Sequence, residues 1–133
     1  MRLDKTELAD RIADAVNRRD LQGFLALMDP EVVVVPRILA VEGGELRGHR
    51  GAQAWWDGIF DAFPDFNLEV IEDREIDGEL GITRMVARGH GKGSGAPFED
   101  WFWVASRARA GKVVWWRRCG SEAEALEAAG RSG

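Results

Sequence analysis

Two charged residues in a strand-rich segment of the chain are the first candidates for chemistry. Asp100 and Arg117 lie in Phe98–Gly120, which holds four of the six tryptophans. A carboxylate in an apolar pocket can act as an acid or a base, because burial raises its pKa. An arginine can bind a carboxylate or the oxygen of an enolate. The two residue types predict proton transfer. The structural alternative is that Asp100 lies at the end of a strand and that Arg117 forms a buried ion pair.

His49 is a third candidate, since histidine can serve as a base near neutral pH. The alternative is that it positions a loop or caps a helix. Cys119 is the only cysteine, and we expect it to be a small buried residue because no histidine is predicted nearby. A zinc site would lack thiolates and suitably spaced histidines, so no metal is expected. No organic cofactor is expected either.

The same segment is typical of a β-hairpin that turns at Ala110-Gly111, where a residue must tolerate positive φ. A two-residue turn pairs Arg109 with Lys112, and Val104 then faces Arg117. Because side chains alternate along a strand, each strand contributes every second residue to each face. A one-residue slip of this register would exchange the two faces.

One face of the hairpin is predicted to line a pocket with residues from the helices. These pocket residues are Phe24, Met28, Trp56, Phe60, Phe102, Val104, Trp115 and Cys119. The other face would expose three tryptophans, a patch larger than soluble monomers usually expose. We therefore predict that a homodimer buries Trp101, Trp103 and Trp116.

Capping residues and apolar spacing predict four helices to support these strands. A capping box of Asp4 and Glu7 begins a first helix that runs to about Arg18, and Asp20 caps a short second helix after a bend. Aromatic residues between Gly51 and Phe63 give the third helix a broad apolar face. A second capping box, Ser121 with Glu124, begins a final helix that ends at Gly130.

Strands fill the remaining chain. Four consecutive valines, Val32–Val35, indicate a strand buried on both sides, and Arg37–Arg47 favours a short hairpin or a loop. Asn67–Glu75 and Leu80–Arg88 precede the hairpin, so four strands can form an antiparallel meander. The prediction is one α+β domain over residues 1–133, with helices on one face of a curved antiparallel sheet.

Composition narrows the classes of partner. The net charge is −5, with acidic and basic residues interleaved, which argues against nucleic-acid binding. No apolar run approaches the roughly 20 residues of a membrane helix, so no membrane association is expected. The first residues are charged and contain no signal-peptide pattern, which makes the cytoplasm the expected location.

Six segments, in order, resemble the SnoaL-like polyketide cyclase group of the nuclear transport factor 2-like superfamily. They are Asn17–Leu21, Leu27–Val32, Gly48–Gly51, Phe60–Asp65, Gly111–Val114 and Glu124–Glu127. The resemblance implies a cone-shaped α+β barrel, with a bent sheet around the N-terminal helices, one deep apolar pocket and a frequent homodimer. It also implies cyclase or isomerase chemistry with a pocket carboxylate. The acid/base aspartate of the cyclases falls at Val104, which cannot transfer a proton.

Two functions follow, and a third is less favoured. The first is an enzyme that transfers protons on a small apolar carbonyl or polyketide-like compound, with Arg117 stabilising negative charge and Asp100 or His49 moving protons. The second is a non-catalytic ligand-binding or dimeric accessory domain, favoured by the missing aspartate. The third is a purely structural interaction module that uses the tryptophan-rich face.

Overall fold

The structure is a computed structural model that describes residues 5–36 and 45–131. Asp4 and most of Arg37–Arg47 lie outside the described residues, so the first capping box and the predicted second hairpin go untested. The helices are α1 (Lys5–Asn17), α2 (Leu21–Ala26), α4 (Gly48–Ala62) and α5 (Glu122–Arg131). The strands are β1 (Met28–Val35), β2 (Leu46–Arg47), β3 (Asn67–Glu75), β4 (Leu80–His90), β5 (Pro97–Arg109) and β6 (Lys112–Cys119).

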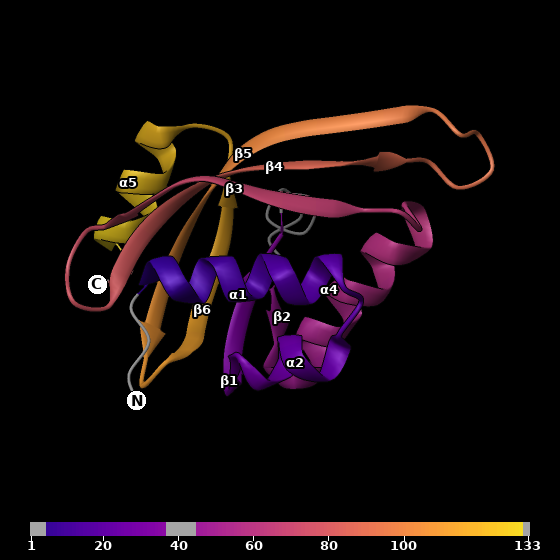
Figure 1. The fold of residues 1–133 in the computed structure, drawn as a ribbon. Helices are drawn as coiled ribbons and strands as arrows, with labels where there is room; N and C mark the ends of the chain where they lie inside the picture. Colours follow the sequence, from indigo (N-terminus) through magenta and orange to yellow (C-terminus); the bar gives the residue numbers. More distant parts are fainter. Residues whose placement is uncertain (1–4, 37–44, 132–133) are drawn as a thin grey trace.

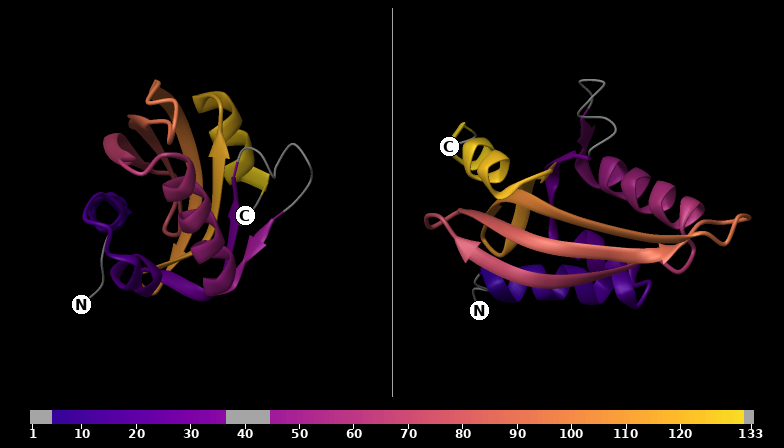
Figure 2. Two further views of the ribbon diagram at one scale, coloured as in Figure 1. Left: turned by 90° about the vertical axis from the view of Figure 1, so that its right-hand side faces the viewer. Right: turned by 90° about the horizontal axis from the view of Figure 1, so that it is seen from above.

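The strands of the described residues form one curved, open sheet in the order β2-β1-β6-β5-β4-β3. β3 to β6 make the predicted antiparallel meander, and β1 joins β6 in parallel. The sheet bends around α1, α2 and α4, while α5 lies on its outer face (Figure 1; Figure 2). The α+β prediction is confirmed. Two of its details are wrong, because α5 packs on the opposite face from the other helices and β1 is parallel to β6, so the helices do not share one face and the sheet is not wholly antiparallel. We call the side of the sheet toward α4 the inner face.

The bend between the first two helices is built by two residues. Arg19 has a φ of 60°, which ends α1 and redirects the chain. The Asp20 side chain then accepts a hydrogen bond from the Gly23 backbone N–H at 2.9 Å, as an N-cap does. Asn17 ties this corner to the sheet through hydrogen bonds with the backbone of Leu68, each 2.8 Å long.

The β5–β6 hairpin turns where the sequence predicts. Ala110 and Gly111 have φ values of 55° and 77°, typical of a two-residue hairpin turn, and Arg109 pairs with Lys112. Ala108 pairs with Val113, also as predicted. Farther from the turn the predicted register is wrong, because a β-bulge at Val114 adds one residue to β6.

The bulge exchanges the faces of β6 while β5 keeps the predicted ones. Val104 lies opposite Arg118 instead of Arg117, and Trp103 lies opposite Cys119. Trp116 and Arg118 therefore face inward, whereas Trp115, Arg117 and Cys119 face outward. The predictions of Trp115, Arg117 and Cys119 on the inner face and of Trp116 on the dimer face are therefore wrong.

Each face of the sheet has its own hydrophobic core. The inner core joins α1, α2 and α4 to the sheet through residues such as Val16, Phe24, Val32, Trp56 and Phe102. In the outer core, α5 packs on the sheet; its buried residues are Ile82, Ala105, Cys119, Ala125, Ala128 and Ala129. Gly120 N–H donates to Glu124 and Glu124 N–H donates to Ser121 Oγ, which fixes the start of α5.

Candidate functional site

A cavity of ≈ 440 Å³ lies between α4 and the inner face of β4, β5 and β6. Apart from one aspartate and one arginine, only hydrophobic side chains and a glycine line it. The lining residues are Pro36, Leu46, Ala54, Trp55, Gly58, Ile59, Ala62, Phe63, Phe66, Ala87, Phe98, Asp100, Phe102, Trp116 and Arg118. The aromatic members come from the predicted third helix, from the chain that follows it and from the hairpin.

Asp100 and Arg118 form an ion pair at the wall of this cavity. Arg118 Nη2 donates to Asp100 Oδ2 at 2.6 Å, and the two side chains are 12% and 30% exposed, respectively. The guanidinium lies 5.0 Å from the ring centroid of Phe102, a cation–π distance. The arginine side chain therefore runs along the sheet over Phe102 to reach Asp100.

The predicted ligand-facing arginine, Arg117, does not line this cavity. It lies on the outer face, and its Nε is buried with no hydrogen-bond partner among the described residues. The prediction failed because it assumed a regular hairpin, whereas the bulge moves every later residue of β6 by one position. Arg118 was missed for the same reason.

His49 sits in the first turn of α4, away from the ion pair. Its Nε2 lies 2.8 Å from the backbone carbonyl oxygen of Met28, which links α4 to β1. It does not line the ≈ 440 Å³ cavity. The contact fits the positioning role that the sequence left open as the alternative.

The other predicted pocket residues fall into three groups. Phe102 lines the large cavity, while Phe24, Met28 and Val104 line two smaller ones. The Trp56 and Phe60 rings pack against each other, 4.9 Å between centroids, in or against the inner core. Trp115 and Cys119 belong to the outer core, which corrects their placement.

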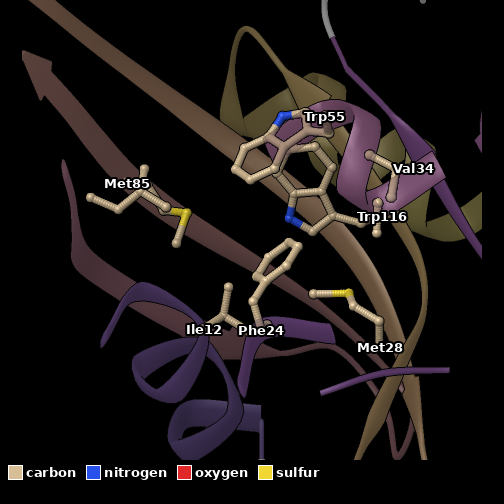
Figure 3. A pocket seen from close by; sticks show the side chains of 9 residues that line it. Ile12, Phe24, Met28, Val34, Trp55, Met85 and Trp116 are labelled. Atoms are coloured by element: carbon tan, nitrogen blue, oxygen red, sulfur yellow. The ribbon is translucent and has the colours of Figure 1, made fainter. Parts of the chain in front are cut away.

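Trp116 stands at the junction of three cavities. It lines the large cavity, an apolar cavity of ≈ 30 Å³ beside Phe24 and Met28, and a third cavity of ≈ 30 Å³ beside Val104. Figure 3 shows its indole next to Trp55 and above Phe24; the two indole centroids are 5.7 Å apart. This residue was predicted on the dimer face, so Trp116 and Trp115 exchange their predicted faces.

The outer core contains one buried thiol, that of Cys119. Burial raises the pKa of the Cys119 thiol, and the nearby Glu124 carboxylate adds to that effect. The thiol is therefore neutral near pH 7, as expected for a packing residue.

Within the described parts of the chain, no group of three His, Cys, Asp or Glu side chains is placed to hold a metal ion.

Comparison with known proteins gives the family. The family model of the SnoaL-like domain matches residues 9–116. The chain belongs to the SnoaL-like family. The match ends before Arg118, so the arginine of the ion pair lies outside the matched region. No curated protein matches the sequence.

Solved structures share the same fold over nearly the whole chain. A loop-truncation variant of IdmH is 28% identical, with a TM-score of 0.73 and coverage of 92% of this chain and 96% of that one. Rv0760c from Mycobacterium tuberculosis, in complex with estradiol-17β-hemisuccinate, is 18% identical (TM-score 0.75, coverage 90% and 95%). TerC, co-crystallised with polyporic acid, is 19% identical (TM-score 0.75, coverage 93% and 95%). Among the described residues, no helix is long and apolar enough to cross a membrane.

Proposed function

We propose that this SnoaL-like protein binds a small, largely apolar carbonyl or polyketide-like compound in the ≈ 440 Å³ cavity and transfers protons on it. The main support is the Asp100–Arg118 pair, which places one carboxylate and one guanidinium in a hydrophobic wall. Ligand pockets are commonly apolar with a few polar groups that fix orientation. The small organic molecules bound by two structural relatives are consistent with a pocket of this kind.

In the proposed reaction, Asp100 removes a proton from the carbon next to the ligand's carbonyl group. Its hydrogen bond to Arg118 uses Oδ2, so Oδ1 can approach that carbon. As the C–H electrons move toward the carbonyl, an N–H of Arg118 donates to the oxygen, which gains negative charge as the enolate forms. If the ligand is a β,γ-unsaturated ketone, the protonated Asp100 then returns the proton to the γ-carbon of the dienolate, which shifts the C=C bond into conjugation with the carbonyl group. Attack of the enolate on a second carbonyl would instead cyclise it.

A non-catalytic binding protein is the second candidate. Val104 is 2% exposed on the inner face, at the position where the resemblance to the cyclases predicts an acid/base aspartate. In addition, Asp100 is already engaged by Arg118. On this alternative the pair orients a carbonyl group but removes no proton.

Proton exchange separates these two candidates without knowledge of the natural substrate. We would incubate β-tetralone with the protein in D2O, follow exchange of the protons next to the carbonyl by NMR, and measure binding by tryptophan fluorescence. For an enzyme we expect exchange at least about a hundredfold above buffer, lost in Asp100→Asn. Glu99→Gln, on the other face of β5, is the matched control and keeps the activity.

The two other results of this experiment are equally informative. Binding with exchange at the buffer rate would contradict catalysis and support the binding function. No binding would contradict the proposal for ketones of this size.

We also propose that the protein is a homodimer through the outer face of the sheet. Trp101 is 45% exposed there, next to the half-buried Trp103, although Trp116 no longer belongs to that face. Arg84 stacks on Trp101, with its guanidinium carbon 5.1 Å from the ring centroid. Exposed tryptophan and arginine side chains are enriched at protein interfaces.

A further inference from the structure

Asp73, Thr83 and Ser106 form a second cluster of polar residues on the inner face, apart from Asp100 and Arg118. Thr83 is only 5% exposed, and its hydroxyl donates to Asp73 Oδ1 at 2.6 Å. Together with Ser106 they line one of the ≈ 30 Å³ cavities, which is large enough for about one water molecule. Polar groups gathered around an internal space are suited to holding a polar part of a ligand.

The strand register places this group in line with the ion pair. Asp73 lies opposite Thr83, Thr83 opposite Val104, and Val104 opposite Arg118. These four residues form one row across β3, β4, β5 and β6. At about 4.8 Å per strand, the backbones of its two ends lie roughly 14 Å apart. The inner face thus has a polar group at each end of the row and valine between them.

Trp116 lies between the two cavities at opposite ends of this row of residues. Its indole lines both the cavity of Asp73 and Thr83 and the large cavity of Asp100 and Arg118. It also lines the apolar cavity between Ile12 and Met85, which adjoins both. A change in the rotamer of this one side chain would therefore join the spaces into a longer pocket.

We propose that Asp73 and Thr83 form a second recognition point for the ligand, with Trp116 as the movable divider. The inference rests on the proposed function and narrows its ligand class. That class is an elongated apolar ketone with a hydroxyl group at the far end. Arg118 donates to the ketone oxygen, whereas the hydrogen-bonded Asp73–Thr83 pair accepts from the hydroxyl group. A donor is required at that end because the Thr83 proton already points to Asp73.

Ketones of increasing length test this proposal. We would measure Kd by tryptophan fluorescence for methyl hexyl to methyl decyl ketone and for their ω-hydroxy analogues. At the length that spans the row, we expect the hydroxyl group to lower Kd about tenfold. In Trp116→Leu, where the divider is smaller, we expect the longest parent ketones to bind about fivefold more tightly than in the wild type.

The double variant Asp73→Leu/Thr83→Val replaces both polar partners by apolar side chains of the same branching, which limits the loss of stability. We expect it to bind the parent ketones normally and to lose the benefit of the hydroxyl group, while Thr83→Ser keeps that benefit. No benefit at any length in the wild type, or an equal benefit in the double variant, would overturn the proposal. Binding of the parent ketones, and its dependence on Arg118, tests the proposed function separately.

Discussion

Arg117 and Arg118 are adjacent in β6, yet they have different surroundings. Arg118 points into the large cavity, passes over Phe102 and contacts Asp100. Arg117 lies on the outer face, where its Nε is buried without a hydrogen-bond partner among the described residues. Since the two side chains are chemically identical, the bulge at Val114 alone decides which arginine can meet a ligand.

The two faces of the sheet differ in the same way. α5 covers the outer face around Ile82, Ala105 and Cys119, each at most 1% exposed. On the inner face the helices stand over three cavities. The outer face near α5 therefore serves stability, while the inner face retains space for a ligand.

Cys119 tests whether the outer core is closed. At pH 8 we expect iodoacetamide to label it about a thousandfold more slowly than in the unfolded protein, because α5 must open first. Burial also raises the pKa of the thiol, which keeps it in the unreactive neutral form. Mass spectrometry of timed samples measures the rate, with guanidinium-unfolded protein as the control. Rapid labelling of the native protein would show that α5 does not cover this face.

The same thiol predicts a direction for the pH dependence of stability. Its folded pKa is raised, so its contribution to the free energy of unfolding is complete below the unfolded pKa of about 8.5. That contribution is lost as the pH rises through the folded value. Urea unfolding from pH 7 to 10 should therefore show a steeper decline for the wild type than for Cys119→Ala. Parallel curves would contradict the raised pKa.

The adjacent arginines form a matched pair of variants. In Arg118→Leu we expect the β-tetralone exchange rate to fall about a hundredfold, because the developing enolate loses its hydrogen-bond donor. In Arg117→Leu, we expect less than a twofold change. NMR exchange measured on both variants, after thermal melting shows that both are folded, gives the comparison. Equal losses would show that the charge acts at long range, and a loss only in Arg117→Leu would contradict the register described here.

The sequence predicts most of the fold because its local signals agree with one another. Asp20 caps α2, Ala110-Gly111 makes the turn, and the meander of four strands follows from hydrophobic runs of the right length. The parallel pairing of β1 with β6 could not be predicted, since it joins segments far apart in the chain. The curvature of the sheet was predicted only from the resemblance to SnoaL-like proteins, because local sequence patterns do not indicate it.

The candidate site was predicted less well, and for one physical reason. Asp100 and Phe102 were placed correctly on the inner face because β5 is regular up to its bulged pairing with β6. Trp116 was placed on the wrong face and Arg118 was missed, because nothing in Val113-Val114-Trp115 marks a bulge. Alternation carries no information about an inserted residue, so one bulge reverses every assignment after it.

A buried aspartate at Val104 tests the inner row directly. Val104→Asp should lower the free energy of unfolding by roughly 3 kcal/mol, because a carboxylate replaces a valine in the core. Arg118 lies opposite, so adding Arg118→Leu should cost about 1 kcal/mol more than the sum of the single changes. Urea unfolding of the four proteins completes the cycle, and Arg117→Leu serves as the additive control. Additivity with Arg118→Leu would mean that the two side chains do not interact.

The smallest expected effect concerns the outer face beyond α5, where we propose the dimer interface. Trp101→Lys should weaken dimerisation about tenfold or more, because tryptophan often carries much of the energy of an interface. It should leave the melting temperature of the monomer nearly unchanged, since Trp101 is 45% exposed. Sedimentation velocity at micromolar concentration measures the change.

Leu126→Lys, at an exposed apolar residue of α5, is the matched control and should remain dimeric. A monomeric wild type would contradict the interface. In that case the Arg84–Trp101 stack would serve only to cover Val86, which is fully buried beneath the outer face.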